Sequence, residues 1–301
     1  MTTKDTNMFM NGTLKQQGSH MIMTNVYKQN RKKYINIDSR FQDGYQTAKE
    51  RSLASFTYTL PITVLNVKSI TAKVVELPHS FYNFSKSAKN TFVSIDTRLC
   101  FITDSYYKDC SALETELNRV YNNDDILFNI DDKTFKTTIT NTSTTATTIK
   151  WNVDEDGTFD RYNLRSKLGW CLGFREPEYT IDGNSTIVSE GIVDISPFKY
   201  LYLVVDDFLN SNPSSFTSPM SDSLMNKRIL ARISVNSNSL MTGSFGSTII
   251  SNTAYNLVSD TRTYLGKMNL QRMKIELVNE WGYVMDLNYM PLSFCLEVEY
   301  E

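Results

Sequence analysis

Strict alternation of apolar and polar residues near the C-terminal end constrains the fold more than any other feature of this chain. In Leu292–Tyr300, the apolar side chains fall on one face, and Ser, Cys and two Glu fall on the other. A period of two is typical of a half-buried strand in a sheet with one wet side. Met273, Ile275 and Leu277 alternate in the same way. This end of the chain therefore predicts a sheet.

Composition places the chain among globular proteins that form a core. Of its 301 residues, 41% are hydrophobic and 12% aromatic, which is too apolar for a disordered polymer. Its 31 basic and 33 acidic residues nearly balance, so we expect no general affinity for nucleic acid. The four cysteines have no CxxC or short paired spacing, which favours a reducing compartment over a disulfide framework.

The N-terminal sequence lacks the apolar core of a signal peptide, and no window approaches 18 consecutive apolar residues. We therefore expect no membrane span, and synthesis and assembly in a cytosol.

Residues 1–33 are polar, without a sustained period, and carry six basic residues against one acidic residue. They predict a basic N-terminal arm, with Lys28, Arg31, Lys32 and Lys33 as candidate interaction residues. One interpretation is a solvated tail. The other is an arm that docks on an acidic neighbour, a membrane surface or nucleic acid, although this basic run is too short to indicate specific nucleic-acid binding.

Residues 34–102 and 190–301 read as successive short strands with turn residues between them. One of these strands, Phe56–Leu60, is expected to end at Pro61 because proline cannot donate to a sheet ladder. This pattern predicts a mainly β fold, an antiparallel β-sandwich of jelly-roll-like form. Residues 103–189 differ and predict a small α+β subdomain inserted between the two β blocks.

One helix is expected in the insertion. Ser111 and Glu114 have the spacing of a capping box, and an apolar helical face follows. In Leu168–Phe174, two glycines separate large apolar residues, which favours a tight turn against a packed aromatic over a ligand pocket.

The inventory of reactive residues argues against catalysis. The two histidines are His20 and His79, and Ser80 beside His79 is a sequence neighbour and not a triad member. No metal-ligand spacing of Cys and His is present. We expect no enzyme activity, no cofactor and no metal.

Two groups of carboxylates are candidates for a metal or proton site. Asp206 and Asp207 are adjacent on a strand and so point to opposite faces, which favours a solvated strand end. Asp154, Asp156 and Asp160 surround a glycine, but without the spacing of a calcium loop, which favours a β-turn.

The order of several segments resembles minor capsid proteins, of jelly-roll and penton type, from nucleocytoplasmic large DNA viruses. The segments are Ile37–Phe41, Phe56–Pro61, Val67–Ile70, Glu76–Pro78, Tyr82–Ser85, Leu168–Arg175, Tyr200–Phe208 and Leu230–Ile233. The resemblance spans about residues 34–301 and transfers no catalytic residue. It implies a virion structural protein that packs under or between major capsid capsomers or at the vertices.

The partners that this resemblance implies are the major capsid protein and other minor capsid proteins, with the chain as an oligomer within the capsid. It leaves open whether the neighbour is a capsomer or an inner viral membrane, and it implies a location in the virion, assembled in the host cytoplasm. The alternative is an outward-facing attachment or glycan-binding module, because jelly rolls also host carbohydrate sites and the chain has 17 tyrosines.

Overall fold

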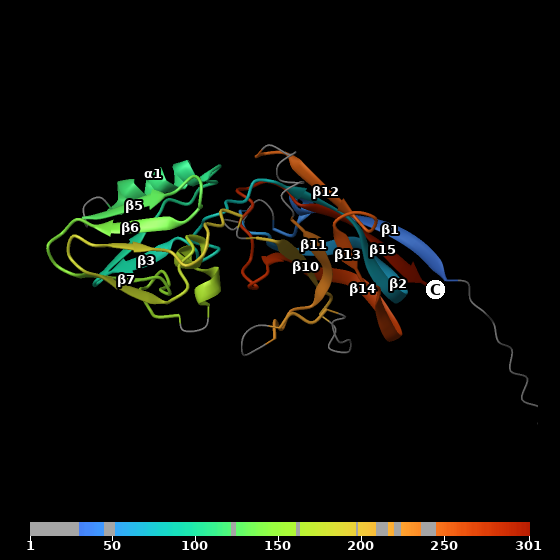
Figure 1. Cartoon of the computed structure of the whole chain (residues 1–301). Helices are drawn as coiled ribbons and strands as arrows, with labels where there is room; N and C mark the ends of the chain where they lie inside the picture. The colour runs from blue at the N-terminus through green and yellow to red at the C-terminus, as the bar shows by residue number, and fades with distance from the viewer. Residues whose placement is uncertain are drawn as a thin grey trace, which may run out of the picture.

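The computed structural model describes residues 30–44, 52–121, 125–160, 163–196, 198–208, 216–219, 224–235 and 245–301. They form two lobes (Figure 1). The larger lobe, called the body, is built around an eight-stranded antiparallel sheet, and the second lobe contains a four-stranded and a three-stranded sheet.

Eight strands make up the sheet of the body. They are β1 (Arg31–Asp38), β2 (Ser55–Pro78), β10 (Tyr200–Asp206), β11 (Ile229–Ser234), β12 (Thr248–Asn252), β13 (Leu257–Ser259), β14 (Arg262–Asn279) and β15 (Ser293–Tyr300). Their order is β1-β15-β2-β14-β10-β11-β13, and β12 also pairs with β2. A short 3-10 helix, Ser39–Phe41, follows β1.

The pairing of these strands is that of a jelly roll. The first half of β2 pairs with β14, and its second half pairs with β15 and β12. With the two halves of β2 counted as separate strands and β13 left out, eight strands remain. In chain order, the outermost two pair (β1 with β15), then the next two inward (the first half of β2 with β14), then the second half of β2 with β12, and finally β10 with β11. This nesting is the order of an antiparallel hairpin rolled into two facing sheets.

The sheet curls until β13, at one end of the strand order, reaches the middle of β2. The Ala72 N–H donates to Ser259 Oγ at 3.1 Å, and the hydroxyls of Thr71 and Thr261 lie 3.0 Å apart. The curl encloses one large hydrophobic core, to which fully buried residues such as Val67, Ile275 and Leu296 contribute. The predicted jelly-roll-like sandwich of mainly β structure is confirmed.

Pro61 does not end a strand, which corrects the sequence-based expectation. β2 continues through it because Pro61 lies in a bulge: Thr59 pairs with Arg272 and Val64 pairs with Leu270, so four residues of β2 face one residue of β14. A bulge frees the proline from the need to donate a ladder hydrogen bond.

The second lobe forms around its own hydrophobic cluster, which includes Phe84, Leu117, Trp151 and Phe174. Its four-stranded sheet, in the order β4-β3-β7-β8, consists of β3 (Phe92–Ile95), β4 (Arg98–Phe101), β7 (Thr147–Lys150) and β8 (Glu178–Ile181). The three-stranded sheet, in the order β5-β6-β9, consists of β5 (Ile126–Ile130), β6 (Thr137–Asn141) and β9 (Thr186–Val188). The helices are α1 (Cys110–Tyr121), α2 (Leu168–Cys171) and the 3-10 helix Leu164–Ser166.

The expected segmentation requires two corrections at its edges. The sequence pattern places β3 and β4 in the sandwich, but Ser94 and Ile95 of β3 pair with β7, and Val93 belongs to the hydrophobic cluster of the second lobe. The sequence pattern places Arg31, Lys32 and Lys33 in an arm, but they are the first residues of β1 and pair with β15. The division into an arm, a sandwich and an insertion otherwise stays a prediction. Among the described residues, no helix is long and apolar enough to cross a membrane.

Candidate functional site

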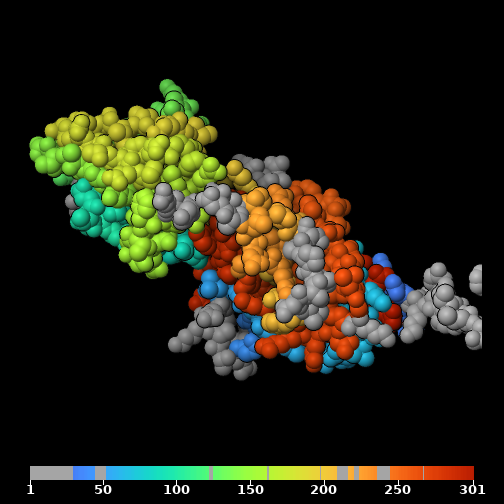
Figure 2. Space-filling view, turned by 90° about the horizontal axis from the view of Figure 1, so that it is seen from below, coloured from blue at the N-terminus to red at the C-terminus, as the bar shows by residue number. Residues whose placement is uncertain are grey.

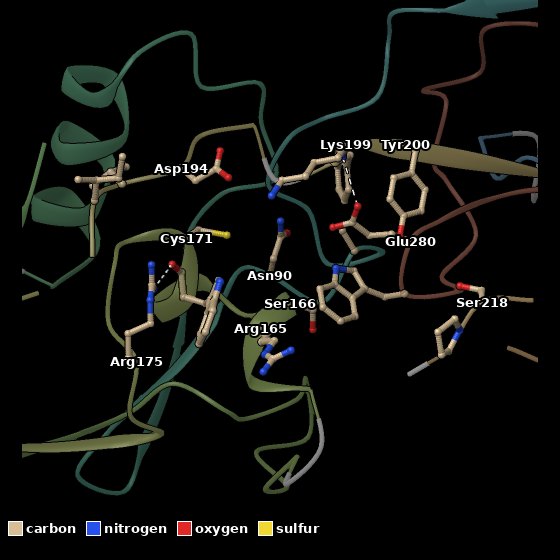
Figure 3. A pocket seen from close by; sticks show the side chains of 17 residues that line it. Asn90, Arg165, Ser166, Cys171, Arg175, Asp194, Lys199, Tyr200, Ser218 and Glu280 are labelled. Atoms are coloured by element: carbon tan, nitrogen blue, oxygen red, sulfur yellow. Dashed lines mark hydrogen bonds between the residues drawn. The ribbon is translucent and has the colours of Figure 1, made fainter. Parts of the chain in front are cut away.

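A large recess lies where the two lobes of the described structure meet (Figure 3). We call it the inter-lobe cleft; its volume is about 960 Å³. The second lobe supplies Arg165, Trp170 and Arg175 to its wall, whereas the body supplies Tyr200 and Glu280. The space-filling view shows the second lobe projecting from the body (Figure 2).

Three basic side chains line the inter-lobe cleft, and one of them has a defined structural role. The Arg175 guanidinium lies 4.2 Å from the centre of the Trp170 ring, and its Nη1 donates to the carbonyls of Trp170 and Phe174 at 3.0 and 3.1 Å. Arg165 lies farther from the same ring, at 5.7 Å, and Lys199 is the third cation. Arg175 therefore holds the α2 turn in place and covers part of Trp170.

Titratable groups in the cleft, Glu280 and Cys171 among them, are shifted toward their neutral forms. Burial raises the pKa of the Glu280 carboxyl, although its hydrogen bond from the Lys199 N–H, at 3.4 Å, opposes the shift. Burial also raises the pKa of the Cys171 thiol to about 12, so this cysteine is a protonated thiol at neutral pH. The Cys171 thiol is therefore a poor nucleophile at neutral pH.

Three of the four sequence-predicted interaction residues do not line this cleft. Arg31, Lys32 and Lys33 begin β1, whereas Lys28 lies outside the described residues. The Lys32 Nζ lies 3.2 Å from Glu297 Oε1 of β15, and this contact raises the pKa of the lysine. These basic residues therefore belong to an edge of the body's sheet.

Asp206 and Asp207 end β10 but do not form a solvated strand end, which corrects that expectation. Both carboxylates reach Arg228, at 3.0 and 2.8 Å. Asp207 is buried and also accepts hydrogen bonds from Arg262 at 3.3 Å and from the Tyr264 hydroxyl at 2.6 Å. The pair anchors β10 to β14 and to the chain entering β11, which is a structural role.

The acidic residues around Gly157 also have structural partners. Asp154 and Asp160 lie 2.5 and 3.2 Å from Nζ of the buried Lys167. Asp156 accepts hydrogen bonds from the backbone and the hydroxyl of Thr158, as expected of a turn. Across the described ranges, no group of three or more His, Cys, Asp or Glu side chains could hold a metal ion.

The neighbours His79 and Ser80 do not act together in the structure. The Ser80 hydroxyl donates to the Leu287 carbonyl at 2.6 Å. The His79 ring instead lies among aromatic rings, 5.3 Å from Tyr106 and 5.8 Å from Phe245. This aromatic contact joins the body to the second lobe, and sequence reasoning did not identify it because its members are far apart in the chain.

Comparisons with known proteins find similarity among solved structures. No family model matches the chain, and no curated protein does. Among solved structures, the mavirus penton protein aligns with 12% identity and a TM-score of 0.41, covering 91% of this chain and 100% of that one. The Sputnik virophage structure aligns with 13% identity and a TM-score of 0.40, covering 89% and 98%. Such TM-scores do not by themselves establish a common fold, so the jelly-roll assignment stands on the strand order of the body.

Proposed function

We propose that the chain is a non-enzymatic structural protein of a virion. In this proposal it is a minor capsid component that packs against major capsid capsomers, or at the vertices, of a large icosahedral DNA virus. The observation that carries the proposal is the nested strand pairing of the body, because jelly rolls are the building units of many viral capsids. The same fold also occurs in lectins and cupins, so the fold alone does not distinguish a capsid role from these functions. Support for the capsid role must also come from features of the protein surface.

An exposed apolar corner gives this support. Ile62 and Leu65 in the bulged part of β2 are exposed, and Leu265, in a bulge of β14, has 94% of its surface accessible. The register places these two bulges beside each other, since Val64 pairs with Leu270 and Val67 with Met268. Large apolar side chains that protrude together on a bulged edge are a feature of protein–protein contact sites.

The apolar corner and the second lobe lie at opposite ends of the molecule. The Glu301 N–H donates to the Asn66 carbonyl at 3.2 Å, which places the C-terminus beside the apolar corner. Figure 1 shows the C-terminus at the end of the body away from the second lobe. A neighbour in a shell can therefore contact the apolar corner without meeting the second lobe.

Incorporation into particles tests this proposal. The epitope-tagged chain would be expressed during infection, and its amount measured by quantitative mass spectrometry across a density gradient. We expect it to sediment with particles and to remain after a high-salt wash. Leu265→Asp should reduce incorporation, because it places a charge on the apolar corner. Leu127→Asp, at an exposed position on β5, is the matched control and should be incorporated normally. A chain that stays in the soluble fraction would contradict the proposal.

The attachment or glycan-binding alternative stays a prediction. The inter-lobe cleft does gather Trp170 and Trp281 with polar groups, but the Arg175 guanidinium occupies part of one indole face. Binding of the purified chain to a glycan array, lost on Trp281→Ala, would favour this alternative.

A further inference from the structure

The free edge of β1 is longer than the terminal strands of the other two sheets in the described residues. β1 has eight residues and a regular register with β15 on one side only. The terminal strands of the other sheets, β4, β8, β5 and β9, have three to five residues. Short edge strands are one way in which proteins avoid unwanted pairing, and β1 lacks that protection.

The backbone groups at this free edge can be assigned from the register. The Ser39 N–H donates to the Leu292 carbonyl at 2.9 Å, and hydrogen-bonded pairs alternate along an antiparallel ladder. The odd-numbered residues of β1 therefore direct their backbone groups to β15. Those of Lys32, Tyr34, Asn36 and Asp38 face outward, where no strand of the described structure pairs with them.

An apolar groove of about 290 Å³ lies next to the same edge. Its walls are Ile35 of β1 and, across from it, residues of the first half of β2, including Tyr58, Leu60 and Ile62. Ile62 is 71% exposed, and Tyr34, on β1, is 61% exposed. A strand that pairs with β1 would place its inward-facing side chains over this groove.

We propose that β1 pairs antiparallel with β1 of a second copy of this chain, about a two-fold axis at Ile35. In this register Lys32 lies opposite the partner's Asp38, and Tyr34 lies opposite the partner's Asn36. The hydrogen-bonded pairs between the two copies are then formed by the even-numbered residues, whose backbone groups face outward. The inward faces of the two sheets become continuous. Shifting the axis to Lys33 would oppose two lysines, and shifting it to Tyr34 would remove the charge pair.

This pairing is isologous, which means that each copy contributes the same edge, and it extends the sheet across two bodies. Around the central Ile35 pair it places six further cross-strand pairs: two charge pairs of Lys32 with Asp38, two of Lys33 with Ile37 and two of Tyr34 with Asn36. The inference concerns the isolated chain and does not depend on the proposed function.

Disulfide trapping tests the register directly. Residues opposite each other in an antiparallel pair have Cα atoms about 4.5–5.5 Å apart, which suits a disulfide. Ile35→Cys should therefore form a covalent dimer under mild oxidation, seen on a non-reducing gel. Leu127→Cys, exposed on β5 in the second lobe, is the control and should stay monomeric. If Ile35→Cys cross-links no faster than Leu127→Cys, the proposal is wrong.

Sedimentation equilibrium provides a second readout that requires no cross-link. Ile35→Lys places two like charges on the two-fold axis and should raise the dissociation constant of the dimer at least about tenfold. Circular dichroism would verify that the variant is folded. A folded Ile35→Lys variant that dimerises like the wild type would overturn the proposal. A dimer absent from particles would contradict the virion role alone, whereas a monomer present in particles would contradict the β1 pairing alone.

Discussion

At the scale of single residues, Lys167 shows how the second lobe holds a charge away from water. Its side chain is fully buried, and its Nζ contacts the carboxylates of Asp154 and Asp160. The Nζ of Lys89 lies 3.3 Å from Asp154 as well, but its side chain is 41% exposed. Two lysines thus contact the same carboxylate, one from a buried position and one from an exposed position. The effect of burial on an ion pair with Asp154 can therefore be compared directly.

We predict that Lys167→Met destabilises the protein by about 3–5 kcal/mol, because two partly buried carboxylates lose their common cation. Lys89→Met should cost less than about 1 kcal/mol, since solvent already screens its ion pair. Chemical denaturation of both variants measures the difference. Equal losses would show that burial does not govern the strength of this network.

Glu116 of α1 should contribute to the acid sensitivity of folding. Hydrogen bonds from the Arg119 guanidinium, with further contacts to Thr103, lower the pKa of this carboxyl to about 2. A folded-state pKa below the unfolded value stabilises the fold above the unfolded pKa, near 4.5, and this contribution is lost as the pH falls toward 2.

The free energy of unfolding of Glu116→Gln should therefore be below that of the wild type at pH 6 and approach it at pH 2.5. Glu155→Gln, at an exposed carboxylate, is the control and should follow the wild type throughout. A difference between Glu116→Gln and the wild type that does not depend on pH would contradict the assignment.

At the scale of elements, the α2 turn depends on a close contact between backbone and an aromatic ring. A Cβ atom on Gly169 would lie 2.2 Å from the Trp151 ring, and that ring stacks on Phe174 at 5.3 Å. The sequence pattern of two glycines among large apolar residues predicted a tight turn against a packed aromatic, and the turn of α2 against Trp151 has that form.

Gly169→Ala should destabilise the protein by about 1–3 kcal/mol or more, because Trp151 is fully buried and cannot move aside freely. Gly266→Ala is the matched control: a Cβ there meets nothing within 4 Å, so its melting temperature should stay close to that of the wild type. Similar losses in both variants would refute the packing argument.

Local signals predicted elements better than they predicted their partners. The apolar face of α1 was visible in the sequence, and Leu113, Leu117 and Tyr121 are buried. The N-cap of α1 was not predicted correctly. Asp109, rather than Ser111, accepts the Ala112 N–H, and the Glu114 carboxylate accepts a hydrogen bond from the Ile130 N–H. Likewise, the local rule that proline ends a strand fails at Pro61, because Pro61 lies in a bulge. Such choices depend on neighbours distant in sequence.

At the scale of the whole molecule, the sequence indicated the class of fold but not the boundary between lobes. Alternation predicted that residues 92–101 were strands, and it could not show which sheet they join, since a β-strand has the same period in either lobe. The inter-lobe cleft could not be predicted from the sequence either. Its lining residues, such as Asn90, Arg165 and Glu280, are far apart in the chain and come together only after folding.

We propose that the nested antiparallel strands of the body make this chain a building unit of a capsid shell. Electron cryomicroscopy of intact particles tests it most directly. We expect the body and second lobe to fit density within the capsid shell, at a fixed position relative to the capsomers. Particles whose shell is fully explained by other proteins, with this chain absent, would contradict it.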